Sequence, residues 1–255
     1  MSLEIHQFPI LNDNYAVLIR EPTSGAVATI DAGDGDAILA EAEAKGWAIT
    51  HILTTHHHAD HTAGNDVIKA RTGCTVVGAN ADRARIPGLD VALSEGDTYD
   101  FGAVTFDVLE TPGHTVGHIS YVAPSVPVAF VGDTLFALGC GRLFEGDARM
   151  MWTSLSKLMA LDPGTIIYCG HEYTAANAAF ALTIDPDNEA LRARAELIKA
   201  LRAEGKATVP TTIEVEQATN PFVRPNDPQI RRNLGLEAAD DWEVFAEVRR
   251  RKDAA

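Results

Sequence analysis

The chain has little cysteine, no long apolar run and few positive charges. Its three cysteines, Cys74, Cys140 and Cys169, lie far apart and outside any CxxC pair. An odd number of scattered cysteines argues against a disulfide framework and favours a reducing compartment. No apolar stretch is long enough to span a bilayer, and the N-terminus lacks the basic and apolar segments of a secretory signal. We therefore expect a cytoplasmic protein with no membrane partner.

Basic residues are also outnumbered. The chain carries 36 Asp and Glu against 21 Lys and Arg, a formal net charge of −15. A strongly acidic surface repels phosphate backbones, so we expect no nucleic-acid partner. An anionic substrate would need a local positive site, which a pair of metals or a basic cluster could supply. With 255 residues, 46% of them hydrophobic, the chain can build one large domain with a smaller appendage, and we expect a monomer.

The pattern of the chain changes near residue 171. Before it, short apolar segments bounded by turn residues predict strands, with a few helical segments between them. Strands are expected at 3–8, 15–20, 26–31, 49–55, 74–78, 97–110, 118–123, 127–131 and 165–169, and helices at 36–45, 62–72 and 150–160. Beyond it, helices are expected at 174–183, 187–204 and 240–252, with an irregular connection at 205–225. We predict an α/β layered domain over 1–171 and a helical domain over 172–255.

The strongest chemical signal is a histidine-rich segment, Thr55-His56-His57-His58-Ala59-Asp60-His61, which follows an apolar strand. Alternate residues of an extended segment point the same way, so His56 and His58 can share one metal. Asp60 and His61 come after the chain begins to turn and can aim at a second metal. Imidazole and carboxylate suit zinc, iron or manganese. Such a tract could also be a solvated surface run, so the rest of the chain has to decide.

Three further polar residues share one setting. His114 in TPGH, Asp133 in GDT and His171 in CGHE each follow the C-terminal end of a short apolar strand, with a glycine just before them. Ligands in α/β folds gather outside strand carboxyl ends, and glycine lets the backbone approach closely. Each residue alone could be an ordinary loop residue, but the joint pattern favours a metal site. The remaining histidines, His6, His51, His57 and His118, are expected to be structural.

The segments THHHADH, TPGHT, GDTLF and CGHEY, in this order and spacing, resemble the metallo-β-lactamase superfamily. Within it, the segments Asn12–Tyr15, Gly139–Arg142, Asn220–Phe222 and Arg249–Asp253 make the chain similar to the glyoxalase II, or hydroxyacylglutathione hydrolase, family. The resemblance implies a four-layer αβ/βα sandwich with a helical C-terminal domain. It also implies a binuclear thioesterase that hydrolyses S-D-lactoylglutathione to D-lactate and glutathione, with a metal-bridging hydroxide as the nucleophile.

The resemblance also assigns the ligands. It implies that His56, His58 and His114 hold one metal and that Asp60, His61 and His171 hold the other. Asp133 would bridge the two. Asp60 and Asp133 are thus the expected catalytic carboxylates, and the two divalent ions are expected to be zinc, with iron or manganese possible.

The family's substrate contacts match less completely. Tyr173, Arg249 and Lys252 match the family pattern. The family's usual lysine and tyrosine in the segment matching Gly141–Glu145 are here Arg142 and Phe144. Arg142 keeps a positive charge, whereas Phe144 lacks a hydroxyl, which costs on the order of 1 kcal/mol of affinity. The alternative for the basic C-terminal residues is a solvated helix end favoured by the helix dipole.

Two other functions stay open at this point. A glutathione persulfide dioxygenase shares the fold and much of the motif, with one iron on His56, His114 and Asp133. A non-catalytic glutathione-binding or metal-binding protein on the same scaffold is the second. The long helical C-terminal region with its basic end favours the hydrolase. Metal content and oxygen uptake separate it from the dioxygenase, and turnover separates it from a binding protein.

Overall fold

The computed structural model describes residues 2–255, and the chain divides into two compact units. Unit 1 comprises Met1–Glu110 and Val116–Gly132, and unit 2 comprises Thr111–Thr115 and Asp133–Ala255. The predicted domain boundary between residues 171 and 172 stays a prediction. It rests on the change from a strand pattern to a helix pattern in the sequence, whereas the two units are defined by the compactness of the folded chain. In residues 2–255, no helix has both the length and the apolar character needed to cross a membrane.

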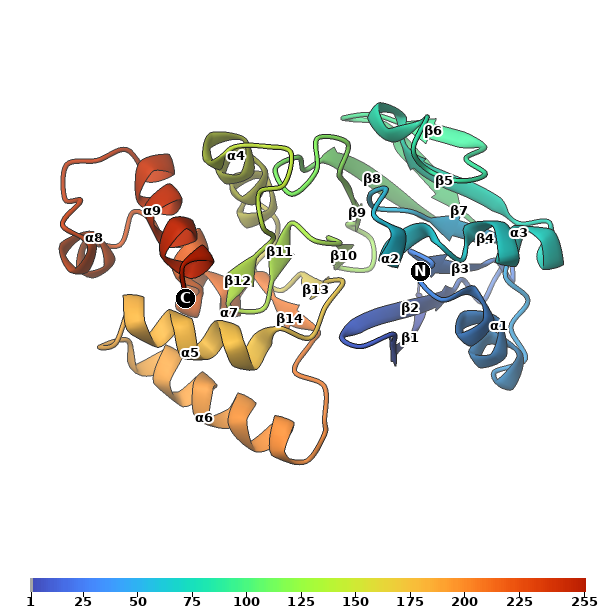
Figure 1. The fold of residues 1–255 in the computed structure, drawn as a ribbon. Helices are drawn as coiled ribbons and strands as arrows, with labels where there is room; N and C mark the ends of the chain where they lie inside the picture. The colour runs from blue at the N-terminus through green and yellow to red at the C-terminus, as the bar shows by residue number, and fades with distance from the viewer. Residues whose placement is uncertain (1) are drawn as a thin grey trace. The chain divides into compact units, whose positions relative to one another are not determined.

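Six strands of unit 1 form a mixed sheet in the order β1-β2-β3-β4-β5-β6 (Figure 1). They are β1 (Glu4–Ile10), β2 (Asn14–Arg20), β3 (Val27–Ile30), β4 (His51–Leu53), β5 (Thr75–Ala79) and β6 (Val91–Leu93). β1 and β2 form an antiparallel hairpin, whereas β3 to β6 run parallel. The C-terminal ends of these parallel strands therefore meet at one edge of the sheet, where the histidine-rich segment follows β4.

Helices α1 (Gly35–Ala44) and α3 (Asn65–Thr72) cover one face of this sheet. Ile38 of α1 and Ile68 of α3 share a buried core cluster with Ile52 of β4. The Asp34 side chain caps α1 by accepting a hydrogen bond from Ala37 N. Between the two, α2 (Ala59–Thr62) is a single turn that begins within the histidine-rich segment.

Four more strands of unit 1 are antiparallel and lie in the order β10-β9-β8-β7. They are β7 (Thr98–Phe101), β8 (Val104–Glu110), β9 (Ile119–Ala123) and β10 (Val128–Phe130). Tyr121 of β9 is fully buried, and its hydroxyl donates to the carbonyl of Thr54, 2.9 Å away, just after β4. The two sets of strands therefore face each other across the core of unit 1, with α1 and α3 on the outer face of the first sheet.

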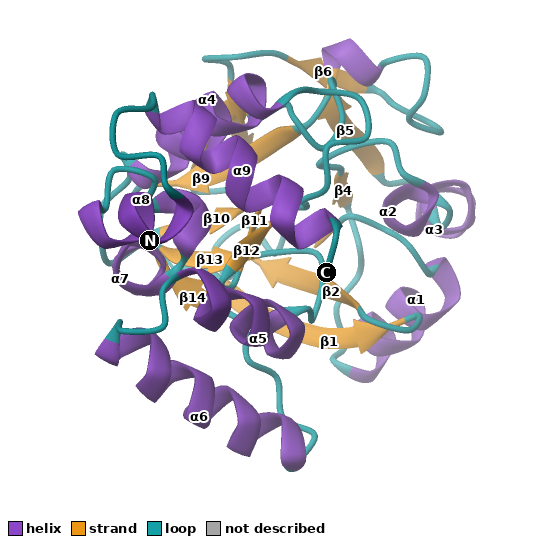
Figure 2. Cartoon of the chain, turned by 60° about the vertical axis from the view of Figure 1, so that its left-hand side comes forward, coloured by secondary structure: helices purple, strands orange, loops and turns teal. Residues whose placement is uncertain are grey.

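Unit 2 is mainly helical, as the purple ribbons of Figure 2 show. Its helices are α4 (Ala148–Met159), α5 (Thr174–Ile184), α6 (Glu189–Ala203), α7 (Ile213–Thr219), α8 (Pro228–Leu234) and α9 (Asp241–Asp253). Two small antiparallel pairs complete it, β11 (Leu135–Phe136) with β12 (Gly139–Cys140) and β13 (Ile166–Tyr168) with β14 (Thr211–Thr212). A buried cluster of Leu138, Ala178 and Leu191 packs α5 and α6 against the β11-β12 hairpin.

The predicted fold class is confirmed, with two main sheets, helices on the outer face of the first sheet and a helical C-terminal region. The expected helices at 36–45, 150–160, 174–183, 187–204 and 240–252 all form within a few residues of their predicted bounds. The prediction of an irregular connection at 205–225 is wrong, because that segment contains β14, α7 and a short 3-10 turn at Pro221–Val223. The Thr212 side chain caps α7 by accepting from Val215 N. This N-cap residue could have predicted the helix, but the prolines of the segment led to the prediction of an irregular connection.

Candidate metal centre

The four ligands predicted in the histidine-rich segment lie together in unit 1. Extended backbone after β4 brings His56 Nε2 to 3.1 Å from His58 Nδ1. Asp60 and His61 lie in the turn of α2, where His61 Nε2 is 3.3 Å from Asp60 Oδ2. His56 and His61 are buried, while the Asp60 side chain is 40% exposed. The segment thus holds two pairs of donor atoms, as its alternation and turn predicted.

The other three predicted ligands lie in unit 2, where two histidines face the same carboxylate oxygen of the aspartate. Asp133 Oδ2 lies 3.4 Å from His114 Nε2 and 3.2 Å from His171 Nε2. All three side chains are at most 7% exposed. Asp133 follows β10 in the sequence, and His171 follows β13, so both residues come after strand ends as predicted.

These separations match those of metal ligands. Two donors at about 2.0–2.1 Å from a tetrahedral ion are about 3.3–3.4 Å apart. The four donor pairs lie 3.1, 3.3, 3.4 and 3.2 Å apart. All seven predicted ligands belong to groups of His and Asp side chains that could hold a metal ion. Nitrogen and carboxylate donors of this kind suit zinc, iron or manganese, so the residues present fit the predicted metals.

Asp31 orients the histidine-rich segment from the neighbouring strand. It follows β3, and its Oδ2 accepts hydrogen bonds from His61 Nδ1 at 2.8 Å and from Thr55 Oγ1 at 2.9 Å. Its Oδ1 accepts from Thr55 N at 2.7 Å. Because an ionised carboxylate only accepts, His61 carries its proton on Nδ1 and turns the Nε2 lone pair toward Asp60.

Two further polar contacts hold the same segment. The buried Asn14 donates from Nδ2 to Asp60 Oδ2 at 2.9 Å. The fully buried Asp82 accepts from His57 Nδ1 at 2.9 Å and pairs with Arg85. His57 therefore points away from its neighbours toward Asp82, which agrees with its predicted structural role.

In unit 2, the backbone and an aromatic ring orient two of the predicted ligands. His114 Nδ1 donates to the carbonyl of Arg142 at 2.8 Å, which leaves Nε2 facing Asp133. The imidazole of His171 stacks on the ring of Tyr173, with ring centroids 4.7 Å apart and an interplanar angle of 6°. The hydrogen bond at Nδ1 fixes the His114 ring on the side away from Nε2, as is usual for metal-binding histidines, whereas Tyr173 packs against the face of the His171 ring.

The five predicted substrate contacts all lie in unit 2 but differ in exposure. Arg142 is exposed, and Phe144 is 64% exposed with its ring edge-on to His114, 5.2 Å between centroids. Tyr173 is 37% exposed. A ligand can therefore reach two aromatic rings that pack directly against two predicted metal ligands.

The remaining two contacts lie on α9. Lys252 is half-buried, and its Nζ donates to the carbonyl of Ala176 at 3.1 Å. Burial, followed by the nearby charges of Arg249 and Arg142, lowers the pKa of Lys252. Arg249 is only 5% exposed and donates to the carbonyl of Cys140 at 3.1 Å and to Asp253 at 2.7 Å. The three cations are therefore close enough to interact, but the Arg249 guanidinium is already engaged inside the protein.

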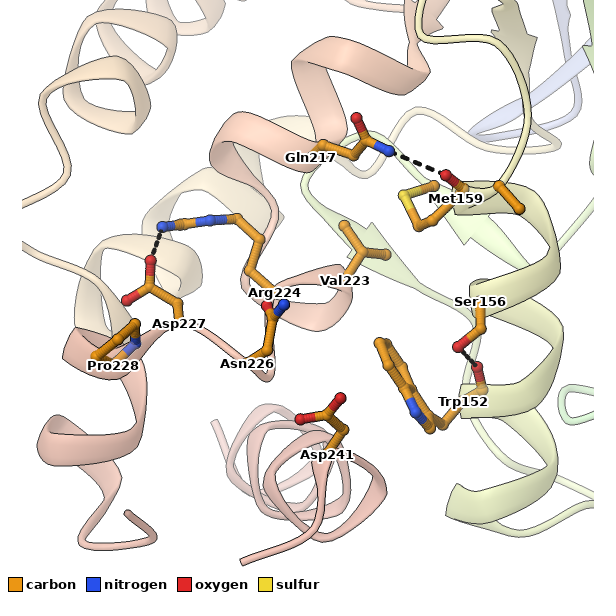
Figure 3. A pocket seen from close by; sticks show the side chains of 11 residues that line it. Trp152, Ser156, Met159, Gln217, Val223, Arg224, Asn226, Asp227, Pro228 and Asp241 are labelled. Carbon is orange, nitrogen blue, oxygen red and sulfur yellow. Dashed lines mark hydrogen bonds and ion pairs between the residues drawn. The ribbon is translucent and has the colours of Figure 1, made fainter. Parts of the chain in front are cut away.

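Unit 2 also has an open hollow between α4, α7 and the N-terminal ends of α8 and α9 (Figure 3). Trp152 and Met159 line one side of it, and Asp227 and Asp241 line the other. Arg224 pairs with Asp227, and Arg231 pairs with Asp241. None of the seven predicted ligands lines this hollow, so it does not compete with them as a metal site.

The sequence interpretation missed the residues that hold the ligands. Asp31 follows a buried strand, the same setting as Asp133, and that signal was available. Asn14 belongs to a segment quoted only for its resemblance, without a role. Asp82 had no local signal, because its role depends on contact with His57, which lies 25 residues away in the sequence.

Comparison with known proteins divides the chain between two family models. Residues 11–171 match "Metallo-beta-lactamase superfamily", and residues 172–255 match "Hydroxyacylglutathione hydrolase C-terminus". The chain is 57% identical over 253 residues, 99% of both chains, to a hydroxyacylglutathione hydrolase of Maricaulis maris. Among solved structures, ETHE1 from Myxococcus xanthus superposes with a TM-score of 0.68 at 26% identity, covering 97% of this chain and 90% of that one. The BLEG-1 B3 metallo-beta-lactamase superposes with a TM-score of 0.67 at 23% identity, over 87% of this chain and 100% of that one. This likeness shows a shared fold.

Proposed function

The chain belongs to the hydroxyacylglutathione hydrolase family of the metallo-β-lactamase superfamily, and from this premise we propose that it hydrolyses S-D-lactoylglutathione to D-lactate and glutathione. The observation that carries the proposal is the donor set. His114 Nε2 and His171 Nε2 face one oxygen of Asp133 at the spacing of metal ligands. The similarity over 99% of a relative with that name supports the same substrate class.

We propose two metal positions. His56, His58 and His114 would hold the first, and Asp60, His61 and His171 would hold the second. Asp133 would bind both ions. This assignment rests on the sequence motif and the family, and the donor spacings within each unit support it. Zinc is the proposed metal, with iron or manganese as alternatives that the same nitrogen and oxygen donors accept.

When bound, two dications supply a water-derived nucleophile near neutral pH and positive charge for the oxyanion that develops on the thioester carbonyl. Asp60 and Asp133 are the proposed catalytic carboxylates, because they anchor the reacting centre and balance its charge. Asp31 keeps the Nδ1 proton of His61 in place, and Arg142, through its carbonyl, does the same for His114. The leaving thiolate belongs to a thiol with a pKa of roughly 8.5, so no separate general acid is required.

We propose that residues 172–255 form the main substrate-binding domain, together with the segment around Arg142. Arg142 and Lys252 would attract the carboxylates of the glutathione moiety, while Phe144 and Tyr173 would pack against its peptide. Arg249 would contribute chiefly through its charge, because its guanidinium already donates to Cys140 and Asp253. The acidic remainder of the chain makes such a local positive site necessary for a substrate with free carboxylates.

A monomer in the cytoplasm remains our proposal for the state of the protein. The proposal of a reducing compartment is supported by three buried cysteines that are all free thiols.

The direct test is loss of thioester absorbance when metal-replete protein meets S-D-lactoylglutathione. Oxygen uptake with glutathione persulfide is measured in parallel. Hydrolysis without oxygen uptake supports the proposal. Oxygen uptake without hydrolysis would show the dioxygenase chemistry instead, and a metal-loaded protein inactive in both assays would be a binding protein.

A further inference from the structure

In the sequence, the β11-β12 hairpin lies between Asp133, a predicted metal ligand, and Arg142, which contacts the predicted ligand His114. It begins two residues after Asp133 and ends two residues before Arg142, whose carbonyl orients His114. Its turn is an unusual one, because Leu138 has a φ of 58°, a left-handed conformation that costs a non-glycine residue roughly 1 kcal/mol. Residues 135–141 are all buried. The hairpin therefore needs partners for its backbone groups from outside itself.

Three buried side chains from α5 and α7 and the residue after α7 supply these partners. Glu216 Oε2 accepts from Leu138 N at 2.9 Å. Asn220 Nδ2 donates to the carbonyl of Gly139 at 3.1 Å, and Asn177 Nδ2 donates to the carbonyl of Ala137 at 3.1 Å. A side-chain Cβ at Gly139 would lie 2.4 Å from Asn177 Nδ2, so the helices and the hairpin approach as closely as the backbone allows.

Glu216 is the centre of this network. It is 0% exposed, and its Oε2 also accepts from Asn220 Nδ2 at 2.9 Å. Its Oε1 accepts from Arg194 Nη2 at 2.5 Å and from Thr211 Oγ1 at 2.7 Å. Because both oxygens of this buried carboxylate are engaged, displacing it would leave buried polar groups without partners, so Glu216 holds the hairpin relative to α6 and β14.

The hairpin in turn fixes the metal-site residues. Gly141 N donates to the carbonyl of Thr134 at 3.2 Å and closes the open end of the hairpin beside Asp133. A Cβ at Gly141 would lie 2.0 Å from the Asp133 carbonyl oxygen and 3.1 Å from His114 Nδ1. A shift of the hairpin by a few tenths of an ångström would therefore move both residues.

We propose that Glu216 is a positioning residue for the metal centre, acting through the β11-β12 hairpin on Asp133 and His114. The proposal rests on the proposed function, since it takes Asp133 and His114 to be metal ligands. It gives the C-terminal region a second role beside substrate binding, because Glu216 and its partners stabilise the geometry in which the ion is bound.

The test replaces Glu216 by glutamine and titrates apo protein with Zn²⁺ against a chromophoric chelator. The substitution removes the negative charge that pairs with Arg194. It also places an amide NH₂, which cannot accept, against one of the two pairs of groups that donate to Glu216. We expect Zn²⁺ affinity to fall roughly tenfold or more, as for residues that orient metal ligands. The kcat for S-D-lactoylglutathione should fall, while KM stays within about twofold. Glu214→Gln, an exposed glutamate on the same helix, is the matched control and should change neither quantity.

A merely structural role predicts a different result. The unfolding temperature of apo Glu216→Gln would fall, but the folded protein would bind Zn²⁺ with wild-type affinity, and that outcome overturns the proposal. If Glu216→Gln does not fold, Asn177→Ala decides, because it removes one hydrogen bond to the same hairpin. Weaker Zn²⁺ binding by Asn177→Ala supports the proposal, and unchanged binding refutes it. A wild-type protein that binds Zn²⁺ but cleaves no thioester would contradict the proposed function alone, since the Zn²⁺ affinities still decide the role of Glu216.

Discussion

Replacing Asp31 by asparagine changes one oxygen into an amide group with almost no change of shape. The Asp31 carboxylate accepts from Thr55 N on one side and from His61 Nδ1 on the other. An asparagine that keeps the bond to Thr55 N turns its NH₂ toward His61. The imidazole can then accept only by moving its proton to Nε2, the nitrogen that faces Asp60. If the amide flips, two N–H donors oppose each other at Thr55.

Both arrangements have a similar cost. A hydrogen bond to a charged group contributes roughly 1.5–3 kcal/mol, and a buried donor without an acceptor costs about 1–3 kcal/mol. Since 1.4 kcal/mol is about a factor of ten in an equilibrium constant, we expect Zn²⁺ affinity to fall roughly ten- to a hundredfold in Asp31→Asn. Turnover under limiting zinc should fall with it.

Competition for Zn²⁺ with a chromophoric chelator measures the affinity, and thermal unfolding of the apo protein measures the fold. Asp34→Asn is the matched control, because Asp34 lies in the same loop and caps α1, where asparagine caps equally well. The reasoning is refuted if Asp31→Asn binds Zn²⁺ as tightly as wild type, because the His61 tautomer would then not depend on this carboxylate.

Three further results are expected. Asp133→Ala should abolish turnover and lower metal content, since its carboxylate faces the Nε2 atoms of two candidate ligands; normal stoichiometry measured by atomic absorption would contradict this. Removing the metal with a chelator should inactivate the enzyme without unfolding it, because unit 1 and unit 2 each have a buried apolar core; a circular dichroism spectrum without secondary structure would show the opposite. Lys252→Ala should raise KM for the glutathione thioester roughly tenfold, with kcat nearly unchanged and with a smaller effect at high salt. Arg249→Ala should instead mainly lower the unfolding temperature. An equal KM in wild type and Lys252→Ala would show that Lys252 does not bind the substrate.

Much of the fold and all seven candidate ligands could be predicted from the sequence because the signals are local. Three of the candidates follow a glycine after an apolar segment, and the other four lie in one histidine-rich segment, so each can be recognised from its neighbours in the sequence. The strands that sequence reasoning missed are β6, β11, β12 and β14, each two or three residues long. So short a segment shows no alternation, and only its partner strand makes it a strand.

Asp31 has the same local signal as Asp133, but the roles of the residues that orient the site could not be predicted because those roles are not local. Asp31 and His61 are 30 residues apart, and Glu216 and Leu138 are 78 apart. Before folding, an aspartate after a strand and a glutamate on an amphipathic helix look like a turn residue and a solvated residue. Burial turns each into a group whose every hydrogen bond must be made, which is why the structure alone reveals them.

The basic C-terminal segment shows how helix periodicity divides residues that composition groups together. Arg250 and Arg251 both pair with Glu247, three and four positions earlier, on an exposed face of α9. Arg250 and then Arg251 lower the pKa of Glu247 to about 2, so this one carboxylate offsets one of their two positive charges. Arg249 and Lys252 lie on the opposite side, where Arg249 is buried against Cys140 and Lys252 reaches Ala176. The alternative of a solvated helix end therefore describes Arg250 and Arg251. An anionic ligand would instead contact Lys252 and the exposed Arg142, and the buried Arg249 would add positive charge nearby.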